Sequence, residues 1–258
     1  MRVVHAKPIL VGISLMLIGV MFTGQSSTKI DPETIVGLWL FDQNSGQTVT
    51  DSSGNNNHGK FVKTPKWVKG KFGNALEFDA GPYVEVPLSK TNDFTGWEQI
   101  SVCAWYKTDV LSDEKWMIRN GQVMIGQTAA PNEWSIAIRI GGAWINTEGL
   151  KSNFPVEKGV WTHVAGVYNG STSKLFVNGK FDREKPAKGG LEKNTNPIMI
   201  GSRGGGQLYD GLIDEVAIFS VPLSTDDIKH IMAQGFEKIQ AVSPGGKLST
   251  VWGDIKKQ

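Results

Sequence analysis

The sequence predicts an all-β protein, a two-sheet antiparallel jelly-roll sandwich with one short C-terminal helix. Apolar and polar residues alternate over 134–140 and 161–168, which is the two-residue period of a strand with two distinct faces. Asn169-Gly170 and Asn178-Gly179 bracket a further such run, and Asn-Gly favours the tight turn that joins paired strands. Short strands with turn signals between them indicate a sandwich and not alternating strands and helices.

The predicted elements are short and are separated by turn residues. Ser224 is followed three residues later by Asp227, a capping arrangement that predicts a helix over 225–234. Ile228 and Ile231 would then share the apolar face of this helix. The expected strands cover residues 36–42, 75–79, 83–86, 100–107, 116–119, 134–140, 160–168, 174–178, 197–200 and 212–219.

Residues 1–26 have the pattern of an export signal peptide. Arg2 and Lys7 give a positive start, and the apolar run 9–22 is too short to span a bilayer comfortably. We expect cleavage after Ser26 and a secreted or periplasmic protein; an uncleaved N-terminal anchor is the alternative. Removing Arg2 and Lys7 from the 27 basic residues leaves 25, which balances the 25 acidic ones. This neutral balance gives no reason to expect nucleic acid or an acidic membrane as a partner.

Few residues belong to recognisable chemical motifs. Cys103 is the only cysteine, so no intramolecular disulfide can form, and its apolar neighbours predict a buried thiol. His58, His163 and His230 lack the spacing of a zinc site, and we expect His163 to pack within its sheet. The glycine-rich stretch 201–207 lacks the Lys-Ser/Thr ending of a phosphate-binding loop, so we interpret it as an inter-strand loop and expect no nucleotide.

Six segments, together with WTHVAGVYNGSTSKLFVNG (161–179), occur in an order that resembles the laminin-G-like (concanavalin A-like lectin/glucanase) superfamily in its bacterial form. The six are GLWLFDQNSG (37–46), VTDSSGNNNHG (49–59), GKFGNALEFDAGPYVEVP (70–87), ISVCAWYKTD (100–109), PIMIGS (197–202) and GLIDEVAIFSVPLSTDDI (211–228). The resemblance implies a sandwich domain over 35–235, with a linker over 27–34 and a tail over 236–258. This fold hosts lectins, adhesion modules, enzyme appendages and hydrolases.

The resemblance also implies where catalytic carboxylates would lie. Glucanases of related fold use a Glu-x-Asp-x-x-Glu strand, whose two glutamates face one cleft. This chain lacks that pattern. Asp214 and Glu215 are adjacent on a strand and are expected to point to opposite faces, while Glu77 and Asp79 lack a third acidic residue. We therefore expect no catalytic residues and no enzymatic activity.

An oxygen-rich loop over 51–59 is a candidate calcium site, because calcium takes six to eight oxygen ligands from carboxylates, amides and carbonyls. In superfamily members, a calcium ion often joins a loop near the N-terminus to the aspartate of the last strand. The resemblance thus implies structural calcium held by Asp51, Asn57 and Asp214. The alternative is that Asp51 and the asparagines only cap turns.

Four tryptophans are candidate platforms for sugar stacking: Trp67, Trp97, Trp116 and Trp144. Most tryptophans of a sandwich lie in its core, and Trp144, in GGAWIN, is the candidate ligand-binding residue. The sequence predicts an exported, non-catalytic binding module for carbohydrate or an extracellular, cell-surface partner. A glycan-active hydrolase or lyase of the same fold and a structural adhesion or assembly protein are the alternatives.

Overall fold

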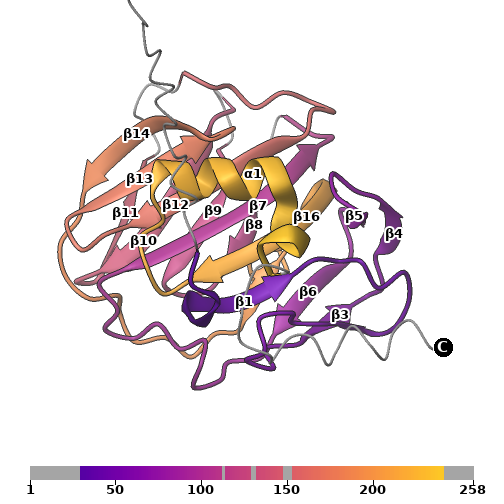
Figure 1. Cartoon of the computed structure of the whole chain (residues 1–258), viewed down its shortest axis with the longest axis horizontal. Coiled ribbons are helices and arrows are strands. Elements are labelled where there is room, and N and C mark those ends of the chain that lie inside the picture. Colours follow the sequence, from indigo (N-terminus) through magenta and orange to yellow (C-terminus); the bar gives the residue numbers. More distant parts are fainter. Residues whose placement is uncertain (1–29, 112–113, 129–131, 148–152, 241–258) are drawn as a thin grey trace, which may run out of the picture.

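A computed structural model of the chain describes residues 30–111, 114–128, 132–147 and 153–240. Two antiparallel eight-stranded sheets face each other, and the helix α1 (Thr225–Gln240) crosses the outer face of one of them (Figure 1). The predicted two-sheet sandwich with one α-helix is confirmed. The predicted signal peptide and the tail beyond residue 240 lie outside the described residues.

Sheet A forms the layer beneath α1 (Figure 1). A short 3-10 turn, η1 (Pro32–Thr34), leads into its first strand. The strands, in spatial order, are β14 (Lys180–Pro186), β13 (Thr172–Val177), β12 (Thr162–Tyr168), β7 (Ile100–Thr108), β16 (Asp210–Phe219), β5 (Asn74–Asp79) and β4 (Lys66–Lys69), with β1 (Ile35–Trp39) also paired to β16.

Sheet B forms the second layer. Its strands, in spatial order, are β11 (Ala143–Asn146), β10 (Trp134–Ile140), β9 (Val123–Gln127), β8 (Lys115–Arg119), β15 (Ile198–Ile200), β6 (Tyr83–Val86), β3 (Gly59–Val62) and β2 (Thr48–Val49). Neighbouring strands are often far apart in sequence, so the chain crosses repeatedly between the two sheets. These crossings place loops from distant parts of the sequence side by side at the ends of the sandwich.

The main core lies between the two sheets. Tyr106 from sheet A stacks on Trp134 from sheet B, with ring centroids 5.9 Å apart. Gly166 of β12 faces Ile136 of β10, and a Cβ at Gly166 would overlap the Ile136 side chain. The sheets therefore approach each other closely here because this position of β12 has no side chain.

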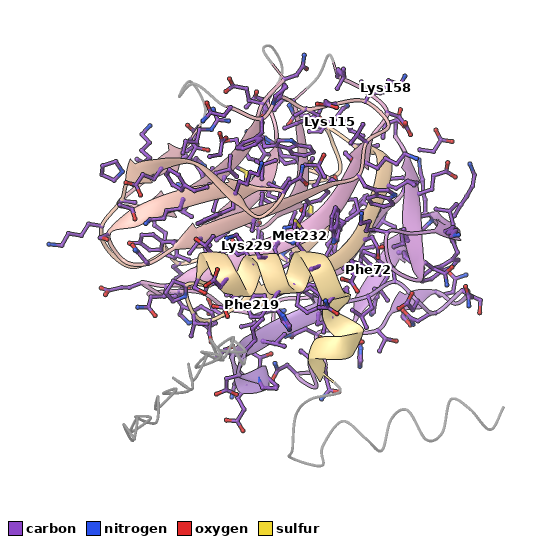
Figure 2. All side chains as sticks on the ribbon, turned by 45° about the horizontal axis from the view of Figure 1, so that its top comes forward. Phe72, Lys115, Lys158, Phe219, Lys229 and Met232 are labelled. Atoms are coloured by element: carbon purple, nitrogen blue, oxygen red, sulfur yellow. The ribbon has the colours of Figure 1, made fainter. Side chains whose placement is uncertain are left out.

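A second apolar cluster lies between sheet A and α1. Cys103 and Phe219 from the sheet meet Ile228, Ile231 and Phe236 from the helix. Figure 2 shows the helix lying over this face, with Phe219 beneath it. Cys103 is buried, as predicted. No helix in the described ranges is long and apolar enough to cross a membrane.

Local sequence signals locate the turns and the helix well. Asn178 and Gly179 both adopt positive φ values, 49° and 70°, as the tight turn between β13 and β14 requires. Ser224 Oγ accepts a hydrogen bond from Asp227 N, and Asp227 accepts from Ser224 N, which confirms the predicted capping arrangement. The helix runs past the predicted end at residue 234, although Gly235 interrupts it with φ 66°.

Candidate ligand-binding face and candidate metal centre

The four candidate tryptophans lie in two kinds of surroundings. Trp67 and Trp97 are half-buried and pack against the main core between the sheets. Trp116 and Trp144 belong to a separate small cluster. Trp116 is 2% exposed, whereas Trp144 is only half-buried. Trp144 is thus the accessible aromatic residue of this cluster.

The cluster lies on the outer face of sheet B, away from the main core. Met124 pairs with Ala137 on one side and with Arg119 on the other, and Arg119 also pairs with Met199. Directly paired residues of antiparallel strands point to the same face, so these four side chains form one row across β10, β9, β8 and β15. We call this row, together with Trp144 where it packs against the cluster, the B face.

A partly exposed ion pair holds the hairpin that carries Trp144. Trp144 on β11 lies directly opposite Arg139 on β10. Arg139 Nε lies 3.1 Å from Glu192 Oε2, and the other oxygen of Glu192 accepts a hydrogen bond from Gly142 N in the hairpin turn. Glu192 therefore fixes both the strand opposite Trp144 and the turn beside it.

Trp116 has a structural role at the edge of the B face. Its indole N–H donates to Glu114, and Arg203 Nη1 lies 2.8 Å from the same Glu114 oxygen. Arg203 Nη1 also donates to Gln207 Oε1 at 2.9 Å. The buried indole is thus satisfied by protein groups, and Glu114 joins β8 to the loop over 201–207.

Asp51 and Asn57 act as caps within their loop. Asp51 Oδ1 accepts hydrogen bonds from the backbone N–H groups of Leu38 and Ser53, and Oδ2 accepts from Asn57 N. Asn57 donates its side-chain N–H to Val36 O. Its Oδ1 accepts from three side chains: Ser89, Thr91 and Asn92. Protein donors thus contact each of the candidate ligand oxygens, as turn-capping side chains do.

Asp214 lies at the hairpin between β4 and β5 and not at the Asp51 loop. Its Oδ2 accepts hydrogen bonds from Lys71 N at 2.8 Å and from Phe72 N at 3.0 Å. Its Oδ1 is buried and has no hydrogen-bond partner of ordinary geometry among the described residues. Burial raises the pKa of Asp214 to about 7, and the negative charge of Asp42 contributes to the increase. The hydrogen bonds from Phe72 N and Lys71 N lower the pKa, but by less.

The surroundings of Asp214 fit a calcium ion in part. Within the described ranges, no three His, Cys, Asp or Glu side chains are grouped to hold a metal. Calcium also accepts amide and carbonyl oxygens, and Asn44 lies at the same hairpin, where its Oδ1 accepts from Asn74 Nδ2. The exposed Asp42 accepts from Asn74 N at 2.8 Å. A cation here would satisfy the buried Asp214 Oδ1, and the nearby charge of Asp42 would attract it.

The prediction that Asp214 and Glu215 point to opposite faces is wrong. The register of β16 shifts between Asp214 and Ala217, and Glu215 adopts a positive φ of 49°. This bulge breaks the alternation. Asp214 accepts from Phe72 N, while Glu215 Oε1 accepts from Phe236 N, and Phe72 and Glu215 both lie against Gly235. Both carboxylates are buried at one corner, so they still do not flank an open cleft.

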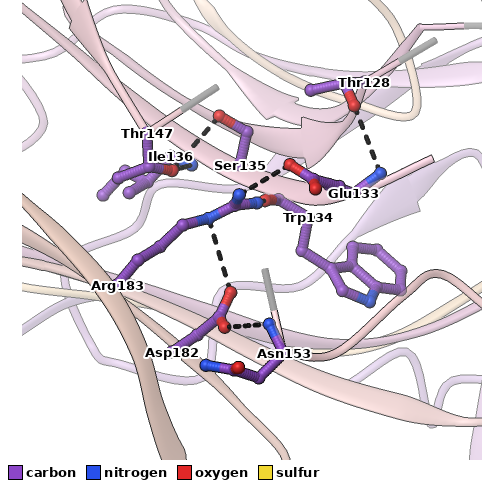
Figure 3. Close-up of polar contacts among 9 residues, drawn as sticks. All are labelled: Thr128, Glu133, Trp134, Ser135, Ile136, Thr147, Asn153, Asp182 and Arg183. Carbon is purple, nitrogen blue, oxygen red and sulfur yellow. Dashed lines mark hydrogen bonds and ion pairs between the residues drawn. The ribbon is translucent and has the colours of Figure 1, made fainter. Parts of the chain in front are cut away.

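A buried polar network joins the two sheets at the opposite edge of sheet A (Figure 3). Arg183 on β14 contacts Glu133 at 2.6 Å, Asp182 at 3.4 Å, and the backbone oxygen of Trp134. Asp182 also accepts from Asn153 N at 2.9 Å. Because Arg183 contacts both carboxylates, this network is a structural cross-link. No local pattern predicts this network, since the Arg183–Glu133 contact spans 50 residues of the chain and the Asn153–Asp182 contact spans 29.

His163 packs within sheet A, as the sequence indicates. It is 1% exposed, and its ring lies 5.3 Å from that of Trp105, which also meets Lys71 and Phe72 from the β4–β5 hairpin. Both ring nitrogens lack a hydrogen-bond partner among the described residues, and burial lowers the pKa of His163 to about 3. A neutral, enclosed imidazole has no access to a substrate.

Comparisons with solved structures show the same fold in binding domains. Domain 4 of AbnA, a GH43 extracellular arabinanase from Geobacillus stearothermophilus, in complex with arabinotriose, is 19% identical with TM-score 0.64, covering 78% of this chain and 98% of that domain. The binding domain of Paraclostridial Mosquitocidal Protein 1 is 14% identical with TM-score 0.65 (80% and 53%). The botulinum neurotoxin DC binding domain, in complex with rat synaptotagmin II, is 16% identical with TM-score 0.62 (81% and 53%). The chain thus spans about half the length of the two toxin binding domains.

Comparison at the level of sequence gives one family. No curated protein matches the chain significantly. The profile of the family Laminin_G_3, described as the concanavalin A-like lectin/glucanases superfamily, matches residues 78–229, which is more than half of the chain. The segment covers strands of both sheets and the start of the helix, and it confirms the resemblance seen in the ordered motifs. The chain therefore belongs to the concanavalin A-like lectin/glucanase superfamily.

Proposed function

We propose that this chain is a non-catalytic carbohydrate-binding module that stacks a sugar ring on Trp144 at the B face. The observation that supports this most is the half-exposed Trp144, held by the Glu192-tethered hairpin on an apolar cluster outside the main core. An aromatic face is complementary to the apolar face of a pyranose or furanose ring, and ligand sites combine such faces with a few oriented polar groups. The arabinotriose complex of the related arabinanase domain is consistent with this function.

A pair of tryptophan variants tests the proposal. Trp144→Ala should weaken binding on a glycan array, or to arabino-oligosaccharides, by about tenfold or more, because a buried or stacked aromatic ring contributes on the order of 1–3 kcal/mol. Trp67→Ala is the matched control, because Trp67 is equally half-buried but packs on the core at sheet A. Equal affinities of the wild type and Trp144→Ala for a bound glycan would contradict the proposal.

A protein partner is the alternative within the same binding class, because one related toxin domain is in complex with synaptotagmin. Export of the chain, with removal of residues 1–26, is part of the proposal and is motivated by the short apolar run after Arg2 and Lys7. Mass spectrometry of the protein recovered outside the cytoplasm should find Ser27 at its N-terminus. Recovery of Met1 would instead indicate an uncleaved anchor.

We also propose a structural calcium ion, held by Asp214 and Asp42 at the β4–β5 hairpin and not by Asp51 and Asn57. The unsatisfied Asp214 Oδ1 and the adjacent carboxylate support this choice, whereas hydrogen bonds within the protein occupy the oxygens of Asp51 and Asn57. Calcium there would tie β16 to the hairpin and to the segment after β1. It would stabilise the fold and leave the B face unchanged.

A second candidate function, glycan cleavage, has one specific observation in its favour. Asp79 and Asp210 are directly paired on β5 and β16, and Asp109 N donates to Asp210 O. Burial and the charges of Asp109 and Asp79 raise the pKa of Asp210, as a general acid requires. If reducing sugar is released from arabinan, galactan or xylan and Asp210→Asn abolishes the release, the chain is an enzyme. We expect no release.

A further inference from the structure

Arg119 is a cation on the B face that forms no ion pair with any residue that the structure describes. Its Nε is buried without a hydrogen-bond partner in the described part of the chain, and none of the ion pairs there includes Arg119. Burial lowers the pKa of Arg119 below its ordinary value, and the positive charge of the nearby Arg203 lowers it further. The site thus brings two guanidinium groups together, with a carboxylate for only one of them.

Two of the carboxylates on this face form ion pairs with other arginines. Glu114 pairs with Arg203, and Glu192 pairs with Arg139. Glu85 lies on the same row, two strands from Arg119 and about 10 Å away, but it stands directly opposite Lys60. An unpaired, partly buried arginine is costly unless something compensates its charge. The missing compensation at Arg119 points to a ligand with a negative charge.

The glycine-rich loop lies beside Nη1 of the partly exposed Arg119. Gly204 has φ +75°, and a Cβ there would lie 3.2 Å from Arg119 Nη1. Gly205 and Gly206 also present no side chain, and both are exposed. Arg203 anchors this loop through Glu114 and Gln207. The loop therefore forms a wall beside Arg119 that does not cover it, a role that suits GSRGGGQ better than phosphate binding.

We propose that the ligand of the B face is an acidic glycan whose carboxylate or sulfate group is bound by Arg119. This inference rests on the proposed carbohydrate-binding function and names the class of sugar. A guanidinium offers a planar fork of N–H donors that matches the paired oxygens of either group. Trp116, Met124 and Ala137 form the floor between Arg119 and Trp144, so one oligosaccharide can contact the arginine and the tryptophan together.

Paired oligosaccharides that differ only in charge test the inference. Oligogalacturonate and its methyl ester probe a carboxylate, and sulfated and desulfated galactan oligosaccharides probe a sulfate ester. We expect the wild type to bind the charged member of one pair about 10 to 100 times more tightly, as one charge-assisted contact implies. Arg119→Met should remove this preference, and Arg119→Lys should keep only part of it. Lys174→Met, which removes a partly exposed cation from sheet A, should leave the preference intact.

The outcomes separate this inference from the proposed function. The acidic-glycan assignment is overturned if the wild type shows no preference for the charged sugar. It is also overturned if Arg119→Met keeps the preference and has an unchanged melting temperature. If neutral sugars still bind through Trp144 in that case, the carbohydrate-binding function stands. If neither charged nor neutral sugars bind, both proposals fail. Which of the two pairs shows the preference identifies the anion as a uronate or a sulfate ester.

Discussion

Arg183 Nη1 lies 2.6 Å from Glu133 Oε2, and this ion pair joins the edge strand of sheet A to the start of β10 in sheet B. The arginine side chain is 4% exposed, so water screens the pair very little. Asp182 and the Trp134 backbone oxygen complete the surroundings of the guanidinium. Removing the cation would take away the positive charge that both carboxylates contact inside the protein.

Arg183→Met should lower the free energy of unfolding by about 3–5 kcal/mol, the range for breaking a buried ion pair from one side. Urea denaturation measures this. Lys174→Met is the matched control, because the partly exposed Lys174–Glu184 pair should contribute less than about 1 kcal/mol. A loss below about 1 kcal/mol for Arg183→Met would show that the network does not hold the sheets together.

Asp214 should make the calcium-free protein less stable as pH rises. Its pKa is raised from 3.8 in the unfolded chain to about 7 in the folded protein. Between these values the folded state binds more protons, so this stabilisation is complete below pH 4 and is lost as pH rises through 7. Asp214→Asn keeps an oxygen for Lys71 N and Phe72 N but cannot ionise. In the presence of chelator, the urea midpoint of Asp214→Asn should decline less between pH 4 and 7 than that of the wild type. An equal decline in both proteins would show that Asp214 does not cause it.

Calcium should act on the same residue in the opposite direction. At about 100 times its Kd, a bound ion stabilises the folded state by roughly 2.7 kcal/mol. Asp214→Asn and Asp42→Asn should each abolish the rise in melting temperature that calcium causes, and magnesium should not replace calcium because it demands stricter octahedral geometry.

Asp51→Asn is the control for the calcium experiment, because the structure assigns Asp51 to turn capping. Its own melting temperature should fall, but its calcium response should match that of the wild type. A response lost in Asp51→Asn and kept in Asp214→Asn would return the ion to the 51–59 loop. No response in the wild type would remove the calcium proposal.

His163 should make the protein sensitive to acid. Its pKa is lowered from 6.5 to about 3, so the unfolded chain binds a proton in this range that the folded protein does not. This contribution to stability is complete above pH 6.5 and is lost as pH falls toward 3. The wild type should therefore be less stable at pH 4 than at pH 7, and His163→Leu should reduce this difference in the free energy of unfolding by an amount on the order of a few kcal/mol. Urea denaturation at the two pH values measures the difference. His230→Leu, on the partly exposed face of α1, is the control and should not show the same reduction.

Local signals predicted ten strands, the Asn178-Gly179 turn and the start of α1, because each depends on residues adjacent in the chain. Six strands were missed: β2, β3, β4, β9, β11 and β14. β14 shows why, since it is a charged edge strand whose Arg183 is buried only because Glu133 and Asp182 meet it. No apolar alternation within residues 180–186 reports that environment.

The sequence by itself determined the sandwich and its superfamily, and it singled out Trp144 as the aromatic candidate. Only the tertiary structure decided that Asp214 and Asp42 lie near the same β4–β5 hairpin, because a bulge in β16 and that hairpin create one corner. It also placed Arg119 on the row that leads toward Trp144, through the pairing of β8, β9 and β10. Strand alternation is a local property, whereas the register between strands depends on packing across the whole sheet.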